Sequence, residues 1–306
     1  MNTFQLNGTQ LCLSALTQVS FRAASCEFLH NVTPKNKAMA LKAFKRGGNS
    51  SGIRVSSIAD LSFLADFPNL RYLEIVGQER VNTRPLDGLS NLRGLRLETP
   101  GTGLDFSCFP ELEVFIGDWH SDNCNVHRCE ELRRLQVWQF KPKSLDLSDI
   151  ANTTRLEWLN LTQTGIASLA GLETLEDLRY CEIAYAPKLE SIDALTKDRL
   201  EVRELSFEKV KKIASYEPIA ALRRLRRLKL TSCSPMSDLN WTKGMDRLDF
   251  FSFVETNVED GDLSPLHELP KLRYIGTLDR KHYNYKFAAI NKILSQRAVT
   301  DNRTRE

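Results

Sequence analysis

One six-residue pattern, Leu-x-x-Leu-x-Leu, returns along most of the chain and limits the folds that the chain can adopt. The first positions of successive units are separated by 22, 20, 20, 24, 22, 24, 23, 23 and 24 residues. A fixed period of roughly 20–50 residues is typical of repeat proteins, in which each unit buries its apolar side chains against its neighbours. The ten units begin at Leu70, Leu92, Leu112, Leu132, Leu156, Leu178, Val202, Leu225, Leu248 and Leu272.

A second apolar series precedes the six-residue pattern and has a spacing of three residues, as in Ile166, Leu169, Leu172 and Leu175. A period of three suits a short 3₁₀ or α turn, whereas the alternation in the following Leu-x-Leu suits a strand. One such coil cannot bury its own leucines. We therefore expect stacked coils that share a continuous apolar core, which is a solenoid.

The unit that begins at Leu156 resembles the repeats of the leucine-rich repeat family, and in particular the bacterial internalin type, because Thr164 fills its turn position. The resemblance implies an α/β repeat solenoid. Such a solenoid is an arc or horseshoe with a parallel β-sheet on its concave face and short 3₁₀, α or coil segments on its convex side. Other repeats hold different residues at the turn position, for example Pro100, His120 and Arg280, so we expect an irregular turn edge.

The repeats divide the chain into regions that we interpret as one domain, because repeat arrays have no internal boundary. Residues 1–50 are predicted to cap the N-terminal end of the core, with a hairpin around Asn7-Gly8 and a helix over Lys35–Arg46. Residues 51–278 hold one degenerate repeat, whose strand we place at 52–55, and the ten full repeats.

The C-terminal region, residues 279–306, is predicted to cap the other end of the core. Helical apolar spacing over 285–294 indicates a capping helix. From about Ala298 the sequence turns polar, and we expect a frayed tail there.

Alternation along each repeat sends the residues beside the second and third leucines to the concave face. Trp138, Trp158 and Tyr180 project from consecutive predicted strands, with Trp119 and Tyr185 at the strand ends beside them. Strands in a sheet lie about 4.8 Å apart, so we expect these rings to form one patch. Since Trp and Tyr are enriched at binding hot spots, the patch predicts a protein partner on the concave face. The alternative is that the rings merely stack on one another along the sheet.

Charged residues on the same face are predicted to set the orientation of the partner, namely Arg134, Glu182, Arg227 and Lys229. Two of them belong to the segment 209–229, which holds eight basic residues and one acidic residue. We interpret this segment either as a docking site for an acidic partner surface or as a solvated run of charges.

Soft metal ligands concentrate in one segment, where His120, Cys124, His127 and Cys129 fall within ten residues. Their spacing matches no familiar zinc finger, and the repeat register places Cys129 in the core. We therefore predict no metal, no cofactor and no enzymatic activity. A metal- or thiol-dependent enzyme built on this segment remains one alternative, and a self-assembling structural protein is another.

Composition and charge narrow the class of protein further. With 42% hydrophobic and 26% charged residues the chain is a folded one, and no apolar run approaches the roughly 20 residues that span a bilayer. The net charge of +3 does not indicate nucleic-acid binding, and seven cysteines without a pairing pattern indicate a reducing compartment. We predict a cytoplasmic, bacterial protein that contacts neither membrane nor nucleic acid and is monomeric when unbound. By fold analogy alone it would be an inhibitor, immunity or adaptor protein.

Overall fold

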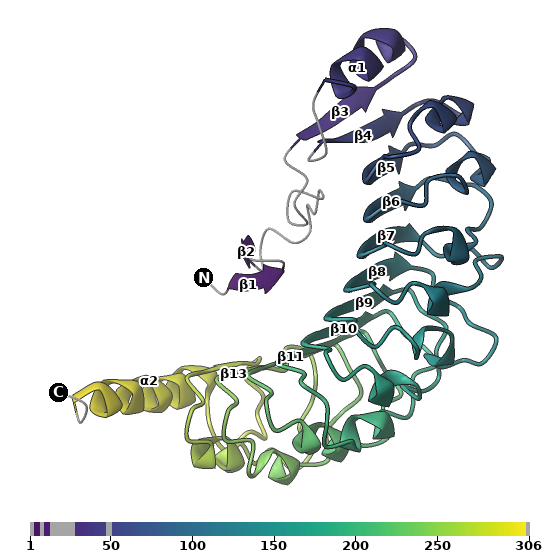
Figure 1. Ribbon diagram of the computed structural model, residues 1–306. Helices are drawn as coiled ribbons and strands as arrows, with labels where there is room; N and C mark the ends of the chain where they lie inside the picture. The colour runs from purple at the N-terminus through teal and green to yellow at the C-terminus, as the bar shows by residue number, and fades with distance from the viewer. Residues whose placement is uncertain (1–2, 7–8, 13–27, 47–50, 304–306) are drawn as a thin grey trace. The chain divides into compact units, whose positions relative to one another are not determined.

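The computed structural model describes residues 3–6, 9–12, 28–46 and 51–303. Their main feature is a parallel sheet of 12 strands, in which β3 to β14 follow one another in sequence order (Figure 1). The strands of this sheet are β3 (Phe28–Val32), β4 (Ser51–Ser56), β5 (Tyr72–Val76), β6 (Gly94–Glu98), β7 (Val114–Asp118), β8 (Arg134–Trp138), β9 (Trp158–Thr162), β10 (Tyr180–Ala184), β11 (Glu204–Glu208), β12 (Arg227–Thr231), β13 (Phe250–Ser252) and β14 (Tyr274–Gly276).

A short 3₁₀ turn precedes each strand from β5 to β14, as the three-residue spacing of the leucines predicts. These strands coincide with the ten sequence repeats, and β4 covers the predicted degenerate strand, so the repeat architecture is confirmed. The 3₁₀ turns are Ser62–Asp66, Arg84–Leu86, Phe106–Cys108, Val126–Arg128, Ser148–Ile150, Leu172–Thr174, Asp193–Thr196, Glu217–Ala221, Asn240–Thr242 and Ser264–Glu268.

The chain divides into two compact units, which we call unit 1 (Met1–Val137) and unit 2 (Trp138–Glu306). In unit 1, helix α1 (Lys37–Phe44) lies inside the predicted range and packs beside β3 and β4. The Phe44 ring contacts His30 at 5.7 Å and Phe67 at 5.5 Å between ring centroids. Strand β3 carries no Leu-x-x-Leu-x-Leu pattern, which is why the sequence did not predict it, yet it pairs in parallel with β4.

The predicted N-terminal hairpin consists of β1 (Thr3–Leu6) and β2 (Thr9–Cys12), which pair antiparallel in a sheet of their own. Its turn at Asn7-Gly8 lies outside the described residues.

The core of unit 2 is a ladder of apolar side chains that repeats from strand to strand. Leu159, Cys181, Leu205, Leu228, Phe251 and Ile275 are partners in register from β9 to β14. Each is at most 1% exposed. Because the strands are exactly in register, each coil places its leucines between those of its two neighbours, and the alternation carries the intervening side chains to the other face of the sheet.

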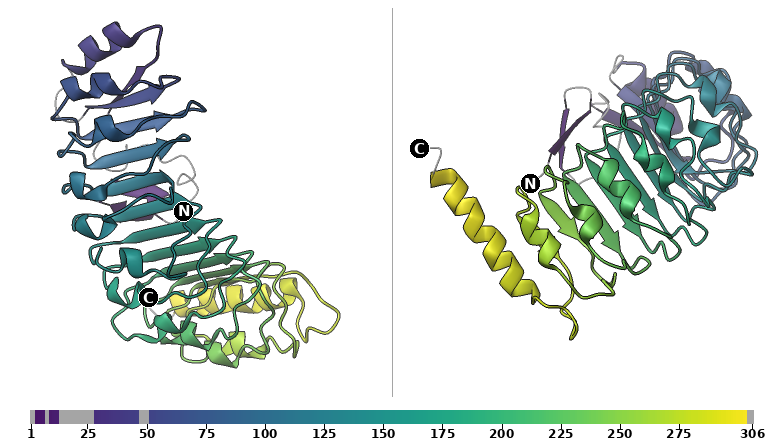
Figure 2. Two further views of the ribbon diagram at one scale, coloured as in Figure 1. Left: turned by 90° about the vertical axis from the view of Figure 1, so that its right-hand side faces the viewer. Right: turned by 90° about the horizontal axis from the view of Figure 1, so that it is seen from below.

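Helix α2 (Phe287–Arg303) lies beside β14 at the end of unit 2 (Figure 2). Its Asn291 side chain accepts a hydrogen bond from the Ile275 amide and donates one to the Ile275 carbonyl, each 3.0 Å long. The Asn291 side chain thus pairs with the N–H and the carbonyl of Ile275 at the edge of the last strand, as a further strand would. The helix continues past Ala298, where the sequence suggested fraying, because neither proline nor glycine interrupts it.

Candidate functional site

We call the side of the sheet that faces away from the 3₁₀ turns the open face. In unit 2 it carries the first, third and fifth side chains of the strands, because the second and fourth enter the core. The predicted partner-binding residues Trp138, Trp158, Tyr180, Glu182, Arg227 and Lys229 occupy such positions.

Trp158 and Tyr180 form the centre of this face and stack on each other. They are partners in register on β9 and β10, with ring centroids 3.5 Å apart and ring planes 10° apart. The rings nevertheless offer little surface, since Trp158 is 3% and Tyr180 9% exposed. The structure therefore brings these two predicted anchors together and buries most of both.

The Glu182 carboxylate fixes the polar end of this pair. It accepts a short hydrogen bond from the Tyr180 hydroxyl and a second, 2.8 Å long, from the Asn160 amide. Burial raises the pKa of Tyr180, and the negative charge of Glu182 raises it further. The tyrosine therefore remains a neutral hydrogen-bond donor.

The other predicted site residues differ in position and burial, and Arg134, as the first residue of β8, occupies a strand position that faces away from the core. In unit 1, Trp119 is half-buried and stacks on the core residue Phe106 at 5.8 Å, while Arg134 is 2% exposed and donates to the Gln136 amide oxygen at 2.9 Å. In unit 2, Tyr185 follows β10 in a left-handed conformation (φ 54°), which directs it to the edge of the sheet. The half-buried Trp138 is the last residue of β8.

The C-terminal strands place the predicted residue Arg227 in a row with two rings that the sequence reasoning did not select. Arg227, Phe250 and Tyr274 are partners in register on β12, β13 and β14. The Arg227 guanidinium lies 4.2 Å from the centroid of the Phe250 ring, which stacks on Tyr274 at 5.0 Å. Tyr274 is 42% exposed. The alternation that pointed to Trp158 also places Phe250 and Tyr274 on this face, so the signal was present in the sequence.

Charge on this part of the face alternates between neighbouring strands. Arg227 Nε lies 3.7 Å from Glu204 Oε2, and Lys229 is half-buried on the same strand as Arg227. Burial raises the pKa of Glu204, although Arg227 and Lys229 oppose this shift. The face thus presents both signs of charge at fixed positions, which suits the orientation of a partner.

Four of the eight basic residues in the segment 209–229 pair with acids on neighbouring coils. Arg224 lies 2.7 Å from Glu201, and Arg226 lies 2.7 Å from Asp249. Lys212 also pairs with a glutamate, at 3.2 Å. These contacts favour the interpretation of the segment as a solvated run of charges over a docking site for an acidic surface.

The cysteine and histidine segment of unit 1 does not gather into a centre. Cys129 is fully buried, donates weakly to the Phe106 carbonyl at 3.5 Å, and has a pKa raised to about 12 by burial. Cys124 and His127 are exposed and His120 is half-buried. In the part of the chain that the structure describes, no three His, Cys, Asp or Glu side chains are grouped to hold a metal ion. Nor does any helix there have the length and apolarity that crossing a membrane requires.

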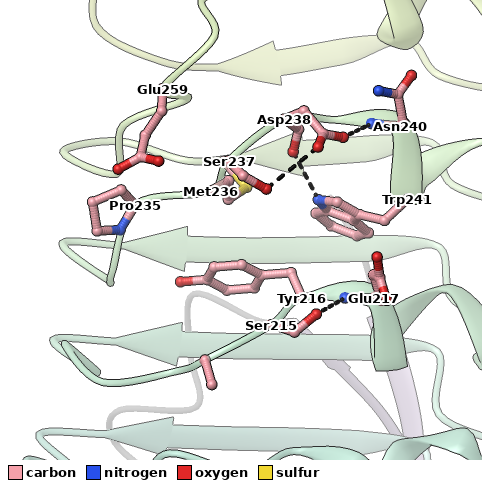
Figure 3. A pocket seen from close by; sticks show the side chains of 11 residues that line it. Ser215, Tyr216, Glu217, Pro235, Met236, Ser237, Asp238, Asn240, Trp241 and Glu259 are labelled. Carbon is pink, nitrogen blue, oxygen red and sulfur yellow. Dashed lines mark hydrogen bonds between the residues drawn. The ribbon is translucent and has the colours of Figure 1, made fainter.

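A cavity of about 310 Å³ opens among the turns of unit 2, and the rings of Tyr216 and Trp241 form part of its lining (Figure 3). Its polar groups bond to the chain itself. Trp241 Nε1 donates to the Asp238 backbone carbonyl at 3.1 Å, and the Asp238 carboxylate accepts from the backbone N–H of Asn240 at 2.7 Å. The Tyr216 hydroxyl donates to the Ser234 carbonyl at 2.8 Å. We interpret this cavity as a space within a set of turns that these hydrogen bonds hold rigid.

No protein-family model and no curated protein matches the sequence. Among solved structures, an internalin (inlF) from Listeria monocytogenes aligns at 21% identity with a TM-score of 0.56, covering 74% of this chain and 65% of that one. Internalin C2 of the same species aligns at 17% identity (TM-score 0.47, 70% and 83% covered). A leucine-rich repeat protein of Leptospira interrogans aligns at 13% identity (TM-score 0.47, 81% and 75% covered). The likeness to the inlF structure agrees with the register of the repeats. The protein has the leucine-rich repeat fold.

Proposed function

We propose that the protein is a non-enzymatic interaction module that holds a protein partner against the open face of unit 2. The observation that carries the proposal is the row of Arg227, Phe250 and Tyr274, which ends in an aromatic ring that is 42% exposed. Arginine and tyrosine are enriched at the centres of protein interfaces. The fold supports such a role in general, because stacked repeats present an extended surface.

The row is held in place before a partner arrives. Phe250 lies between Arg227 and Tyr274, and the Tyr274 ring meets Phe287 of α2 edge-on at 6.3 Å. A side chain that is already immobile loses little conformational entropy on binding. Less of its interaction energy with the partner is then offset, and its contribution to affinity is larger.

The predicted central residues complete the face in this proposal. Trp158 and Tyr180 form a stiff floor, Trp138 lies at its rim, and Glu182 and Lys229 supply opposite charges that orient the partner. A cytoplasmic inhibitor, immunity protein or adaptor that is monomeric until it meets its partner is the form of this function that we propose, by analogy of fold.

A photo-crosslinking amino acid at position 274, compared with one at Lys243, tests the proposal. Lys243 is exposed and follows a 3₁₀ turn on the opposite side of the coil. In lysate of the source cells, we expect one protein to crosslink at position 274 and none at position 243. Without the crosslinking amino acid, the Tyr274→Asp variant should capture at least tenfold less of the same protein than the wild-type chain does. Equal crosslinking at both positions would remove the open face from consideration.

A further inference from the structure

A groove of about 350 Å³ opens at the edge of unit 2 where the strands end. It lies between the loops that follow β9 and β10 and the segment 141–145. Its apolar wall consists of Leu145, Tyr185 and two prolines, Pro142 and Pro187. The groove is separate from the open face and shares none of its strand residues.

Leu145 is held with its side chain toward solvent. It is 39% exposed and has a φ of 60°, a region that bulky residues rarely adopt. Its backbone is fixed by a hydrogen bond from its own amide to the Pro142 carbonyl at 3.2 Å and by one from the Ala167 amide to its carbonyl at 2.6 Å. Residues held in such conformations cluster at functional sites.

Tyr185 lines the same groove and is 40% exposed. Its φ of 54° recurs where other strands of unit 2 end, so this conformation belongs to the repeat. Among the described residues only five large hydrophobic side chains are exposed, and this groove holds two of them. Their convergence makes a small apolar patch of the kind that marks interaction sites.

The sequence explains why the groove occurs at this repeat. The unit from Leu132 to Leu156 has 24 residues, against 20 in each of the two preceding units, and the longer loop forms the wall at 141–145. Gly165 keeps the space beside this wall open, because a Cβ atom there would lie 3.1 Å from Cγ of Lys141.

The charged side chains that line the groove are both lysines. Lys141 and Lys188 line it, and Lys209 donates to the Tyr185 hydroxyl at 3.1 Å with its ammonium 4.6 Å from the ring centroid. No acidic residue contributes to the lining that the structure describes, and within that part of the chain neither Lys141 nor Lys188 forms an ion pair. The groove therefore complements an apolar group flanked by carboxylates.

We propose that this groove binds a short acidic segment of a protein partner. One aliphatic or aromatic side chain of the segment lies between Leu145 and Tyr185, and its neighbouring Asp or Glu side chains pair with Lys141 and Lys188. The inference rests on the proposed function as a protein-interaction module and adds the chemistry of the partner. It uses a different surface, so the two proposals can fail separately.

Selection of a displayed library of random 12-residue peptides on the full chain tests this inference. We expect the selected peptides to carry one large apolar residue flanked by Asp or Glu. A synthetic copy of the leading peptide should bind at least tenfold more weakly to Leu145→Gly and to Lys188→Glu, and more weakly in high salt. Leu145→Gly is the sharper variant, because glycine adopts a φ of 60° readily and the fold should not suffer.

Two controls separate this inference from the open-face proposal. Lys243→Glu changes an exposed charge outside the groove, and Tyr274→Asp changes the open face. Both should bind the peptide as the wild type does. The inference would be overturned by a selection that yields no binder, by peptides without acidic residues, or by full binding to Leu145→Gly. Loss of binding in Tyr274→Asp alone would assign the peptide to the open face and would equally overturn it.

Discussion

Trp158 shows how a residue on the open face can belong energetically to the core. Its strand position faces away from the leucines, yet stacking on Tyr180 leaves it only 3% exposed. Burial of a side chain depends on the size of its neighbours in adjacent strands as well as on the face that it occupies. Tyr274 occupies the same position of its repeat at the end of the sheet and is 42% exposed.

This contrast predicts unequal effects of removing the two rings. Trp158→Ala should lower the free energy of unfolding by about 3 kcal/mol, since it leaves a cavity beside Tyr180. Tyr274→Ala should lower it by less than about 1 kcal/mol, since the ring is already half in water. Urea denaturation followed by circular dichroism measures both. Equal losses would mean that the stacking of Trp158 contributes little to stability.

At the scale of the element, the strands end in a recurring left-handed residue. The φ values of these residues lie between 52° and 62°, and none of them is glycine. Each amide, from Gln139 to Ser232, donates to a carbonyl of the next coil, as Gln139 does to Thr162 at 2.9 Å. The positions are Gln139, Gln163, Tyr185, Lys209, Ser232 and Glu255.

Gln139 offers a test of the strain at these positions, because its side chain is exposed. Gln139→Gly should leave the melting temperature unchanged or raise it, since glycine adopts a positive φ at no steric cost. Gln139→Val should lower the free energy of unfolding by more than about 1 kcal/mol, because a β-branched residue is poorly tolerated there. A valine variant as stable as the glycine variant would show that the backbone has relaxed out of this conformation.

The strands and their two faces could be predicted because the leucines specify both at once. The left-handed residues could not, since neither glycine nor asparagine marks them, and this is why Tyr185 lies in the edge groove and not beside Tyr180. The burial of Trp158 and the pairing of the basic segment also escaped prediction, because both depend on which side chains meet across coils. At the turn position, Thr164 donates to the Phe140 carbonyl of the preceding coil at 2.7 Å, which its hydroxyl made foreseeable.

At the scale of the whole molecule, stability is a sum of contacts between neighbouring coils, so the ends of the sheet need separate protection. An uncovered edge strand offers free amides and carbonyls to other chains. In unit 2 the α2 helix covers β14, and Asn291 bonds both polar groups of Ile275.

Asn291→Ala should therefore affect both stability and association. It leaves the Ile275 amide and carbonyl without these partners, which should cost about 1–3 kcal/mol. Light scattering should show concentration-dependent association that the wild type lacks. Lys292→Ala, an exposed change on the same helix, should do neither. A monomeric Asn291→Ala variant of unchanged stability would mean that α2 protects the edge by its bulk alone.

The two hydrogen bonds of Asn291 also have a consequence for engineering. They occupy the N–H and carbonyl of Ile275, which an added strand would need for pairing. A longer array therefore cannot be built by appending coils after β14 while this residue remains in place. New coils would have to be spliced between existing ones, for example between β12 and β13, whose strands pair in parallel and in register. Grafted behind the last strand of another open repeat array, the same amide and its helix would provide a transferable stop.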